Sequence, residues 1–229
     1  MATTKILIVD DEVLFRELLS RTLAREPGLD VVGTALDGQT AVRLAAQTRP
    51  DVVLMDIELP GELDGIQAAL RIKRDRPHMG IVLLSAHNDR RYLTSLPLAD
   101  SSGWSYLLKQ SVPDLATLVR TIQGSREGMV VLDPAVVQGL RPTNGSAVMR
   151  LTRRQQEVLA LIAQGYSNAA IAQRLVLSEK SVETYIGAIY QQLLLTGEPE
   201  IHARVQATLL FLRESQPRPR PASRQALSG

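Results

Sequence analysis

The sequence contains no cysteine, only three histidines and few aromatic residues. Without cysteine, a disulfide framework, a thiolate zinc site and a cysteine nucleophile are all excluded. The histidines, His78, His87 and His202, have unrelated spacings, so a histidine-based metal site is not expected. Aromatic residues form 3% of the chain and hydrophobic residues 45%, so leucine, valine, isoleucine and alanine must build the cores.

Long hydrophobic runs are also missing. No run reaches the roughly 18 apolar residues that a segment needs to cross a bilayer. Residues 1–7 lead straight into strand-like sequence, without an apolar signal core followed by a cleavage site. We therefore expect a soluble, cytoplasmic protein that does not enter a membrane. Its 229 residues leave room for one large or two ordinary domains.

The first half of the chain alternates short apolar runs with stretches of helical periodicity. The runs predicted as strands are residues 5–9, 30–34, 51–55, 80–84 and 106–108. Their apolar residues form continuous runs and do not alternate with polar ones, which is typical of a parallel sheet that helices cover on both faces. We therefore predict that residues 1–123 form an α/β domain with a doubly wound, parallel, five-stranded sheet of the flavodoxin-like type.

Polar residues follow these predicted strands at the ends where such sheets bind ligands. They are Asp10, Asp11, Asp56, Ser85 and Lys109. Three neighbouring carboxylates would raise one another's pKa unless a cation neutralised them, and Mg²⁺ suits carboxylate and phosphate oxygens. A carboxylate nucleophile, a metal, a lysine and a hydroxyl donor are together what phosphoryl transfer needs.

Four sequence blocks resemble the signature blocks of the receiver domains of two-component response regulators. They are residues 9–12 (Val-Asp-Asp-Glu), 54–60 (Leu-Met-Asp-Ile-Glu-Leu-Pro), 84–86 (Leu-Ser-Ala) and 106–109 (Tyr-Leu-Leu-Lys). The resemblance covers residues 4–123. It implies that Asp56 accepts a phosphoryl group from a sensor histidine kinase. It also implies that the protein is a regulator and not an enzyme, beyond taking part in its own phosphorylation and dephosphorylation.

The same resemblance assigns the remaining residues of this site. Asp11, Asp56 and the backbone carbonyl of Glu58 would bind Mg²⁺, with support from Asp10. Lys109 would contact the phosphoryl group, Ser85 would be the switch hydroxyl, and Tyr106 the aromatic residue that rotates with it. Taken singly, Asp10 and Asp11 could instead cap a helix, Lys109 could be a solvated lysine, and Tyr106 could be a packing residue.

The chain changes character after residue 123. Residues 124–149 contain glycine, proline, asparagine and serine with short apolar pieces, and we predict a linker. Residues 150–214 show only helical periodicity. Residues 215–229 are rich in proline, arginine and serine, so we predict a disordered tail. The tail arginines suit either solubility or DNA contact.

Within residues 150–214 the pattern predicts a helix-turn-helix. Thr152 and Gln155 can form a capping box, and Ser167 and Ser178 can cap the next two helices. The helix that begins after Ser178 carries one apolar face and one face of small and polar residues. A small-residue face of this kind can enter the major groove of DNA. We therefore predict a small all-α DNA-binding domain.

Residues 151–194 resemble the LuxR-type domain, and the whole chain resembles the NarL/FixJ group of response regulators. The resemblance implies a recognition helix over residues 178–192 and a helix over 200–212 that pairs two protomers. Double-stranded DNA is then the partner, with a homodimer as the active form. The residues implied to contact DNA are Arg153, Arg154, Asn168, Lys180, Ser181, Glu183, Thr184 and Ala188.

The charge of this domain is unusual for a DNA-binding protein. Residues 151–212 carry five basic and five acidic side chains. Because phosphate contacts dominate DNA affinity, a neutral domain should bind weakly alone and depend on dimerisation. Two other functions remain open: an aspartate-nucleophile phosphatase, and a receiver with an RNA-binding helical output.

Overall fold

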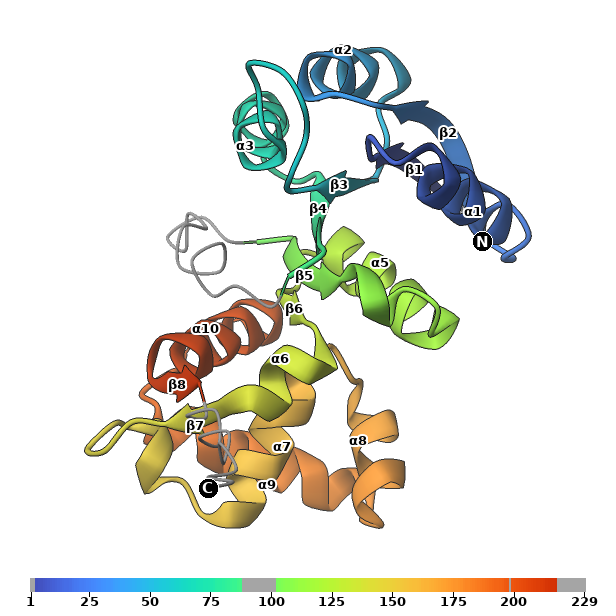
Figure 1. Ribbon diagram of the computed structural model, residues 1–229. Helices are drawn as coiled ribbons and strands as arrows, with labels where there is room; N and C mark the ends of the chain where they lie inside the picture. Colours follow the sequence, from blue (N-terminus) through green and yellow to red (C-terminus); the bar gives the residue numbers. More distant parts are fainter. Residues whose placement is uncertain (1–2, 88–101, 198, 218–229) are drawn as a thin grey trace, which may run out of the picture.

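The computed structural model describes residues 3–87, 102–197 and 199–217, and its N-terminal domain is a parallel α/β sandwich (Figure 1). Its strands are β1 (Thr4–Val9), β2 (Leu29–Ala35), β3 (Val52–Asp56), β4 (Gly80–Ser85), β5 (Trp104–Leu108) and β6 (Val131–Leu132). Its helices are α1 (Val13–Leu23), α2 (Gly38–Thr48), α3 (Gly65–Asp75) and α5 (Leu115–Arg126), with a 3-10 turn η2 (Lys109–Ser111). The strand order is β2-β1-β3-β4-β5-β6, and every pairing in this sheet is parallel.

The alternation of side chains along the strands separates two hydrophobic cores. On β1, Leu7 and Val9 join the core on the α2 and α3 side, whereas Ile6 and Ile8 join the core that includes α1 and α5. Residues 52–56, 80–85 and 104–108 are buried throughout, as the continuous apolar runs predicted. The predicted doubly wound parallel fold is therefore confirmed.

The sheet has six strands, one more than the sequence analysis predicted. The extra strand, β6, comes from the predicted linker and pairs with Ser105 and Tyr106 of β5. Val130, Val131 and Leu132 are all buried, which explains why this apolar piece joins the sheet. Predicted linker residues also form α6 (Pro134–Gly139) and β7 (Leu140–Pro142), and the 3-10 turn η3 (Val148–Arg150) spans the predicted boundary with the C-terminal domain.

The C-terminal domain consists of α7 (Arg153–Ala163), α8 (Asn168–Leu175), α9 (Glu179–Gln192) and α10 (Glu200–Arg213). The predicted Thr152–Gln155 capping box is present, and Ser167 and Ser178 cap α8 and α9. The predicted tail begins with strand β8 (Ser215–Pro217), which pairs antiparallel with β7. Residues 218–229 lie outside the described residues.

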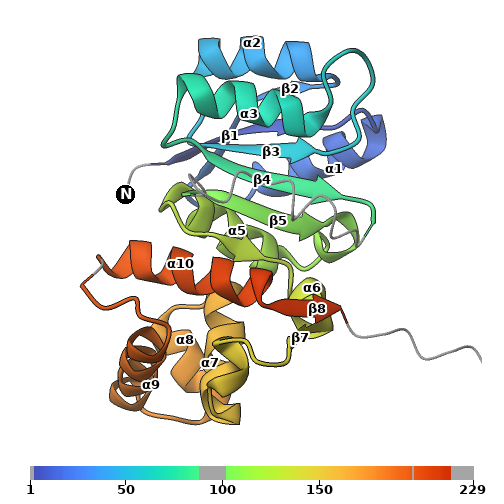
Figure 2. The ribbon, with the colours of Figure 1, turned by 90° about the vertical axis from the view of Figure 1, so that its left-hand side faces the viewer.

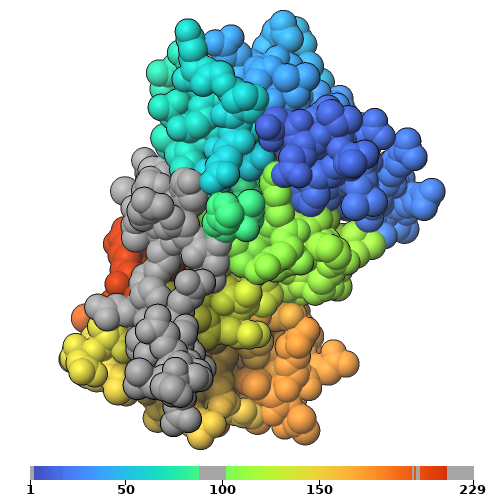
Figure 3. Space-filling view, viewed as in Figure 1, coloured from blue at the N-terminus to red at the C-terminus, as the bar shows by residue number. Residues whose placement is uncertain are grey.

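The two domains are joined by a continuous hydrophobic core. One cluster of buried side chains includes Leu83 and Trp104 of the sheet together with Val158 of α7 and Phe211 of α10. Helix α10 runs beneath the sheet, on the same side of it as α3 (Figures 1 and 2). In the space-filling view the green surface of α5 meets the yellow-to-orange surface of the C-terminal domain directly (Figure 3). Across the described part of the chain, no helix combines the length and apolar character needed to span a membrane.

Candidate phosphoacceptor site and DNA-binding interface

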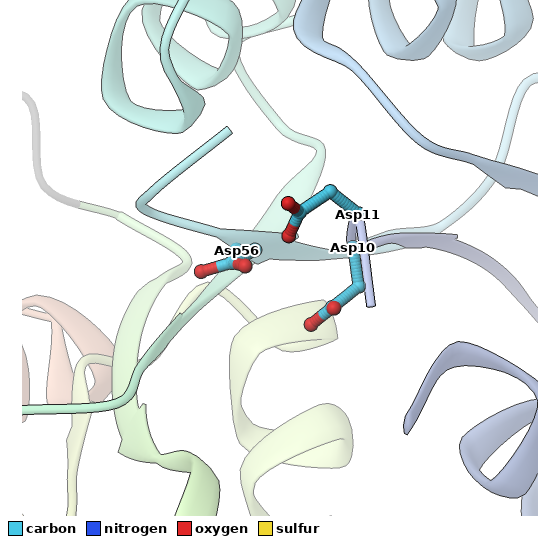
Figure 4. Close-up of side chains that lie close together, drawn as sticks. All are labelled: Asp10, Asp11 and Asp56. Atoms are coloured by element: carbon cyan, nitrogen blue, oxygen red, sulfur yellow. The ribbon is translucent and has the colours of Figure 1, made fainter. Parts of the chain in front are cut away.

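The predicted acidic residues meet at one edge of the sheet. Asp10 follows β1, Asp56 ends β3, and the parallel pairing of Val9 with Met55 places the two strand ends side by side. Carboxylate oxygens of Asp10, Asp11 and Asp56 all lie within 4.8 Å of one another (Figure 4). Asp10 and Asp56 are buried, whereas Asp11 is exposed. The neighbouring Gly65 is required there, because a Cβ atom would stand 1.7 Å from the Asp56 carbonyl oxygen.

Lys109 is the cation of this cluster. Its Nζ atom lies 2.9 Å from Asp10 Oδ2, 2.9 Å from Asp56 Oδ2 and 2.8 Å from Glu12 Oε1. The ammonium also stands 5.0 Å from the centre of the Phe15 ring, a cation–π contact. Sequence reasoning did not identify Glu12 or Phe15 as contacts of this lysine. Lys109 is thus held over Asp56 and is not a solvated surface lysine.

The pKa values follow from burial and from this lysine. Burial raises the pKa of Asp56 to about 6, because the hydrogen bond and charge of Lys109 only partly offset the loss of hydration. Burial also raises the pKa of Asp10. Burial alone would lower the pKa of Lys109, but its hydrogen bonds to Glu12, Asp10 and Asp56 outweigh burial and raise it. In the cluster itself, four carboxylates, those of Asp10, Asp11, Glu12 and Asp56, surround the single ammonium of Lys109.

The donor set suits a hard divalent cation. Three carboxylates converge, and the exposed Asp11 leaves one side open to water. Mg²⁺ binds through one or two carboxylates and keeps several waters. Neither Asp10 nor Asp11 caps α1, whose N-cap is Glu12, so the helix-cap interpretation of this pair is wrong. Asp10 Oδ1 instead accepts the backbone N–H of Glu12 at 2.9 Å.

Ser85 and Tyr106 meet at one backbone carbonyl. The Ser85 hydroxyl donates to the His87 carbonyl oxygen at 2.7 Å, and the Tyr106 hydroxyl donates to the same oxygen at 2.8 Å. Both side chains are buried. The two residues that the sequence analysis paired as switch groups therefore share an acceptor, and Tyr106 points inward. Residues 88–101, between β4 and β5, lie outside the described residues, and Trp104 is buried in β5.

The residues predicted to contact DNA fall into two groups. On α9, Lys180, Glu183 and Thr184 are exposed, and Ser181 and Ala188 are half-buried. Arg153 at the start of α7 is also exposed. In contrast, Arg154 donates to Glu157 at 2.8 Å and to the Leu175 carbonyl at 2.7 Å. Arg154 therefore serves the fold by joining α7 to the end of α8.

Asn168 lies at the N-terminus of α8 and faces the other domain. Its Oδ1 atom accepts a hydrogen bond from Arg204 Nη1 at 3.0 Å. Asn168 and Arg204 line a cleft of about 640 Å³ whose opposite wall includes Arg120 and Gln123 of α5. Asn168 is thus half-buried in the cleft between the two domains, and its side-chain oxygen is bonded to Arg204 of its own domain.

One contact between the domains was not predicted from the sequence. Arg120 of α5 donates from Nε to the Gln164 carbonyl at 3.0 Å, and its guanidinium stacks 4.1 Å from the Tyr166 ring centre. Arg174 of α8 stacks on the same ring at 4.2 Å. Tyr166 thus joins a cation of the N-terminal domain to a cation of the helix-turn-helix.

Comparisons with known proteins agree with both halves of this description. The response regulator receiver domain matches residues 6–123, and the LuxR family of bacterial regulatory proteins matches residues 149–209. The transcriptional regulatory protein DegU of Brevibacillus brevis is 33% identical over 210 residues, covering 82% of this chain and 87% of DegU. The response regulator protein VraR of Staphylococcus epidermidis is 34% identical, covering 90% of this chain and 94% of VraR.

A solved structure supports the same assignment. The crystal structure of a LuxR-family two-component response regulator from Aurantimonas sp. aligns with a TM-score of 0.53 at 32% identity. The alignment covers 60% of this chain and 94% of that chain. The chain therefore belongs to the two-component response regulators of the NarL/FixJ group, which are transcription regulators and not classical enzymes.

Proposed function

We propose that Asp56 accepts a phosphoryl group from the phosphohistidine of a sensor kinase, and that this controls DNA binding by α9. The observation that supports this most is the contact of Lys109 with Asp56 inside a cluster of carboxylates. A phosphoryl group on Asp56 would bring oxygens to a lysine that is already held in place. A fixed cation lowers the energy of a charged transition state without reorganisation.

Each residue of the cluster has a separate part in this proposal. The Asp56 carboxylate is the nucleophile, and its raised pKa of about 6 still leaves it mostly ionised at pH 7.5. Asp11, Asp56 and the carbonyl of Glu58, with support from Asp10, would hold Mg²⁺, which, when bound, neutralises phosphate oxygens. Lys109 would turn from Asp10 and Glu12 toward the phosphoryl group.

Ser85 would exchange one hydrogen bond for another when Asp56 is phosphorylated. Its hydroxyl would leave the His87 carbonyl and donate to a phosphoryl oxygen, so that Tyr106 alone holds that carbonyl. A phosphorylated active state then has a different set of hydrogen bonds at the ends of β4 and β5. Such a difference can shift a population between two states.

The first test is chemical phosphorylation of the full chain. Wild-type protein and Asp56→Asn are treated with phosphoramidate and Mg²⁺, and intact mass and oligomeric state are followed together. Asp51→Asn is a control, because Asp51 binds the Lys5 amide at the other end of the strands. We expect one phosphoryl group on wild type and Asp51→Asn, and none on Asp56→Asn. An unmodified wild type would contradict the proposal.

The second test concerns the output. A random double-stranded DNA library is selected against phosphorylated protein, and Lys180→Ala and Thr184→Ala are measured on the selected sequence. We expect Lys180→Ala to weaken binding and to reduce the salt slope by about one if it contacts a phosphate. Selection of RNA and not of duplex DNA would favour an RNA-binding output. Turnover of small phosphate esters would favour a phosphatase, although Glu58 and Leu59 depart from the pattern of aspartate-nucleophile phosphatases.

Dimerisation on phosphorylation and a cytoplasmic location remain part of the proposal. The even charge balance of residues 151–212 supports dimerisation, because two neutral domains must combine their few cations to bind DNA.

A further inference from the structure

Asp133 is the most deeply buried acidic residue of the linker, and it holds two elements together. Its side chain is fully buried. The Oδ2 atom accepts the backbone N–H of Leu108 at 2.9 Å, and Oδ1 accepts the N–H of Ala135 at 2.7 Å. The Asp133 backbone N–H in turn donates to the Tyr106 carbonyl at 2.8 Å. One residue thus connects the end of β5 with the first turn of α6.

The β5 side of this connection leads to the phosphoacceptor site. Strand β6 pairs only with Ser105 and Tyr106, so the ladder stops before Leu108. Beyond the end of the ladder, the carboxylate of Asp133 accepts the hydrogen bond of the buried Leu108 N–H in place of a strand carbonyl. Leu108 pairs with Ser85 on the opposite side, and Lys109 follows it directly. The backbone that carries the lysine is therefore fixed from two sides.

The α6 side of the connection leads to the DNA-binding domain. Asp133 is the N-cap of α6, and Val136 and Val137 of that helix are buried in the core shared with α7. Val131, two residues before Asp133, fits closely against Gly165 in the turn between α7 and α8. A Cβ atom on Gly165 would stand 2.8 Å from the Val131 side chain. A shift of β6 would therefore press on that turn.

We propose that Asp133 is a positioning residue that couples the phosphoacceptor site to the output domain. It fixes Lys109 through Leu108 and makes the end of β5 move together with α6. Movement of Lys109 toward a phosphoryl group is then passed to α6 and to the α7–α8 turn. This inference rests on the proposed phosphorylation of Asp56.

Two substitutions separate coupling from simple helix capping. Asp133→Ser keeps a good N-cap for α6, but a hydroxyl is too short to hold Leu108 as well. Asp133→Asn keeps the shape but replaces one acceptor oxygen with a donor. Asp37→Asn is the matched control, because Asp37 caps α2 through Thr40 and, among the residues that the structure describes, its side chain bonds to no other element.

Each full-length variant is treated with phosphoramidate and Mg²⁺. The phosphorylation rate is read by intact mass, and amide hydrogen exchange of residues 131–139 and 163–167 is compared before and after. We expect wild type and Asp37→Asn to show a phosphorylation-dependent change in both segments. Asp133→Ser and Asp133→Asn should lose that change and phosphorylate about 3–10-fold more slowly, the equivalent of one lost hydrogen bond.

Wild-type rates and exchange changes in Asp133→Ser would overturn the inference, since Asp133 would then be only a helix cap. If Asp133→Asn does not fold, the phosphorylation rate and hydrogen exchange of the cap-preserving Asp133→Ser alone test the inference. If wild type itself takes no phosphoryl group, the proposed function and this inference fail together. If wild type is modified and both Asp133 variants behave like it, only this inference fails.

Discussion

The buried carboxylate of Asp56 carries an energetic penalty that the proposed phosphoacceptor role explains. Its folded-state pKa of about 6 lies above the unfolded value near 3.9, so the ionised form opposes folding. The stability linked to this group is therefore complete below about pH 4 and is lost as pH rises through about 6. The proposed metal and phosphoryl group would relieve this penalty, because both add charge partners to the buried carboxylate.

We expect Asp56→Asn to stabilise the protein in metal-free buffer at pH 7.5, by about 1–2 kcal/mol. Lys109 keeps Asp10 and Glu12 as partners in this variant, so the lysine is not left alone. Chemical denaturation of both proteins measures the difference, which should shrink below pH 5. The difference should also shrink with millimolar Mg²⁺. An Asp56→Asn protein less stable than wild type at pH 7.5 would show that the Lys109 contact outweighs burial.

Asp11 should behave differently, because it is exposed. We expect Asp11→Asn to change metal-free stability by less than about 0.5 kcal/mol, as for other surface substitutions. The loss of one of three converging carboxylates should nevertheless weaken Mg²⁺ binding, by about tenfold or more for a direct ligand. The measurement is the rise in melting temperature as Mg²⁺ is added. An unchanged Mg²⁺ dependence would remove Asp11 from the ligand set.

At the scale of elements, the turn between α8 and α9 holds an unfavourable residue. Val176 has a φ of 54° and is 91% exposed, although β-branched residues seldom adopt left-handed backbone conformations. We expect Val176→Gly to stabilise the protein by about 0.5–1 kcal/mol, because glycine adopts this conformation without steric strain. Leu194, with a φ of 59° and similar exposure, offers a parallel substitution just after α9. Denaturation midpoints give the result, and destabilisation by both glycines would show that chain entropy outweighs the strain.

The elements also show what sequence patterns can and cannot predict. Strand β3 and its terminal Asp56 are predictable, because a buried parallel strand is a continuous apolar run and its polar end residue stands out. Helix caps such as Thr152 and Ser178 are predictable too, because a cap depends only on residues within one turn of it in the sequence. Strand β6 is only two residues long, so periodicity cannot reveal it. The Lys109–Glu12 contact spans 97 positions and depends on the folded sheet.

At the scale of the molecule, the predicted dimerisation helix is enclosed. Buried residues occupy nearly every position of its last three turns: Ala203, Arg204, Val205, Ala207, Thr208, Leu209, Phe211 and Leu212. The remaining positions of these turns, His202, Gln206, Leu210 and Arg213, are exposed or half-buried and form one narrow stripe along the helix. Only this stripe is open to a second copy, so extensive pairing through α10 would require the helix to leave the sheet.

The Arg120–Tyr166 contact should help to hold this closed arrangement. Arg120→Ala removes the hydrogen bond to Gln164 and one of the two guanidinium stacks on Tyr166. Because Asn168 lines the cleft beside Arg120, loosening the contact should widen the space between α5 and the N-terminus of α8. We expect unphosphorylated Arg120→Ala to bind the DNA sequence selected with wild type about 3–10-fold more tightly than wild type does. The reason is that the closed arrangement loses about one interaction and the open one becomes more populated.

Arg126→Ala is the control for this prediction, since Arg126 lies on the same helix but donates to Thr4 within the receiver. It should leave DNA affinity unchanged while it alters stability slightly. Small-angle scattering of the unphosphorylated proteins provides a second measurement, and only Arg120→Ala should give a larger radius of gyration. Equal DNA affinity in wild type and Arg120→Ala would mean that the shared core, and not the Tyr166 stack, keeps the two domains together. In that case α10, through Phe211 and its neighbours, would be the element whose release limits activation.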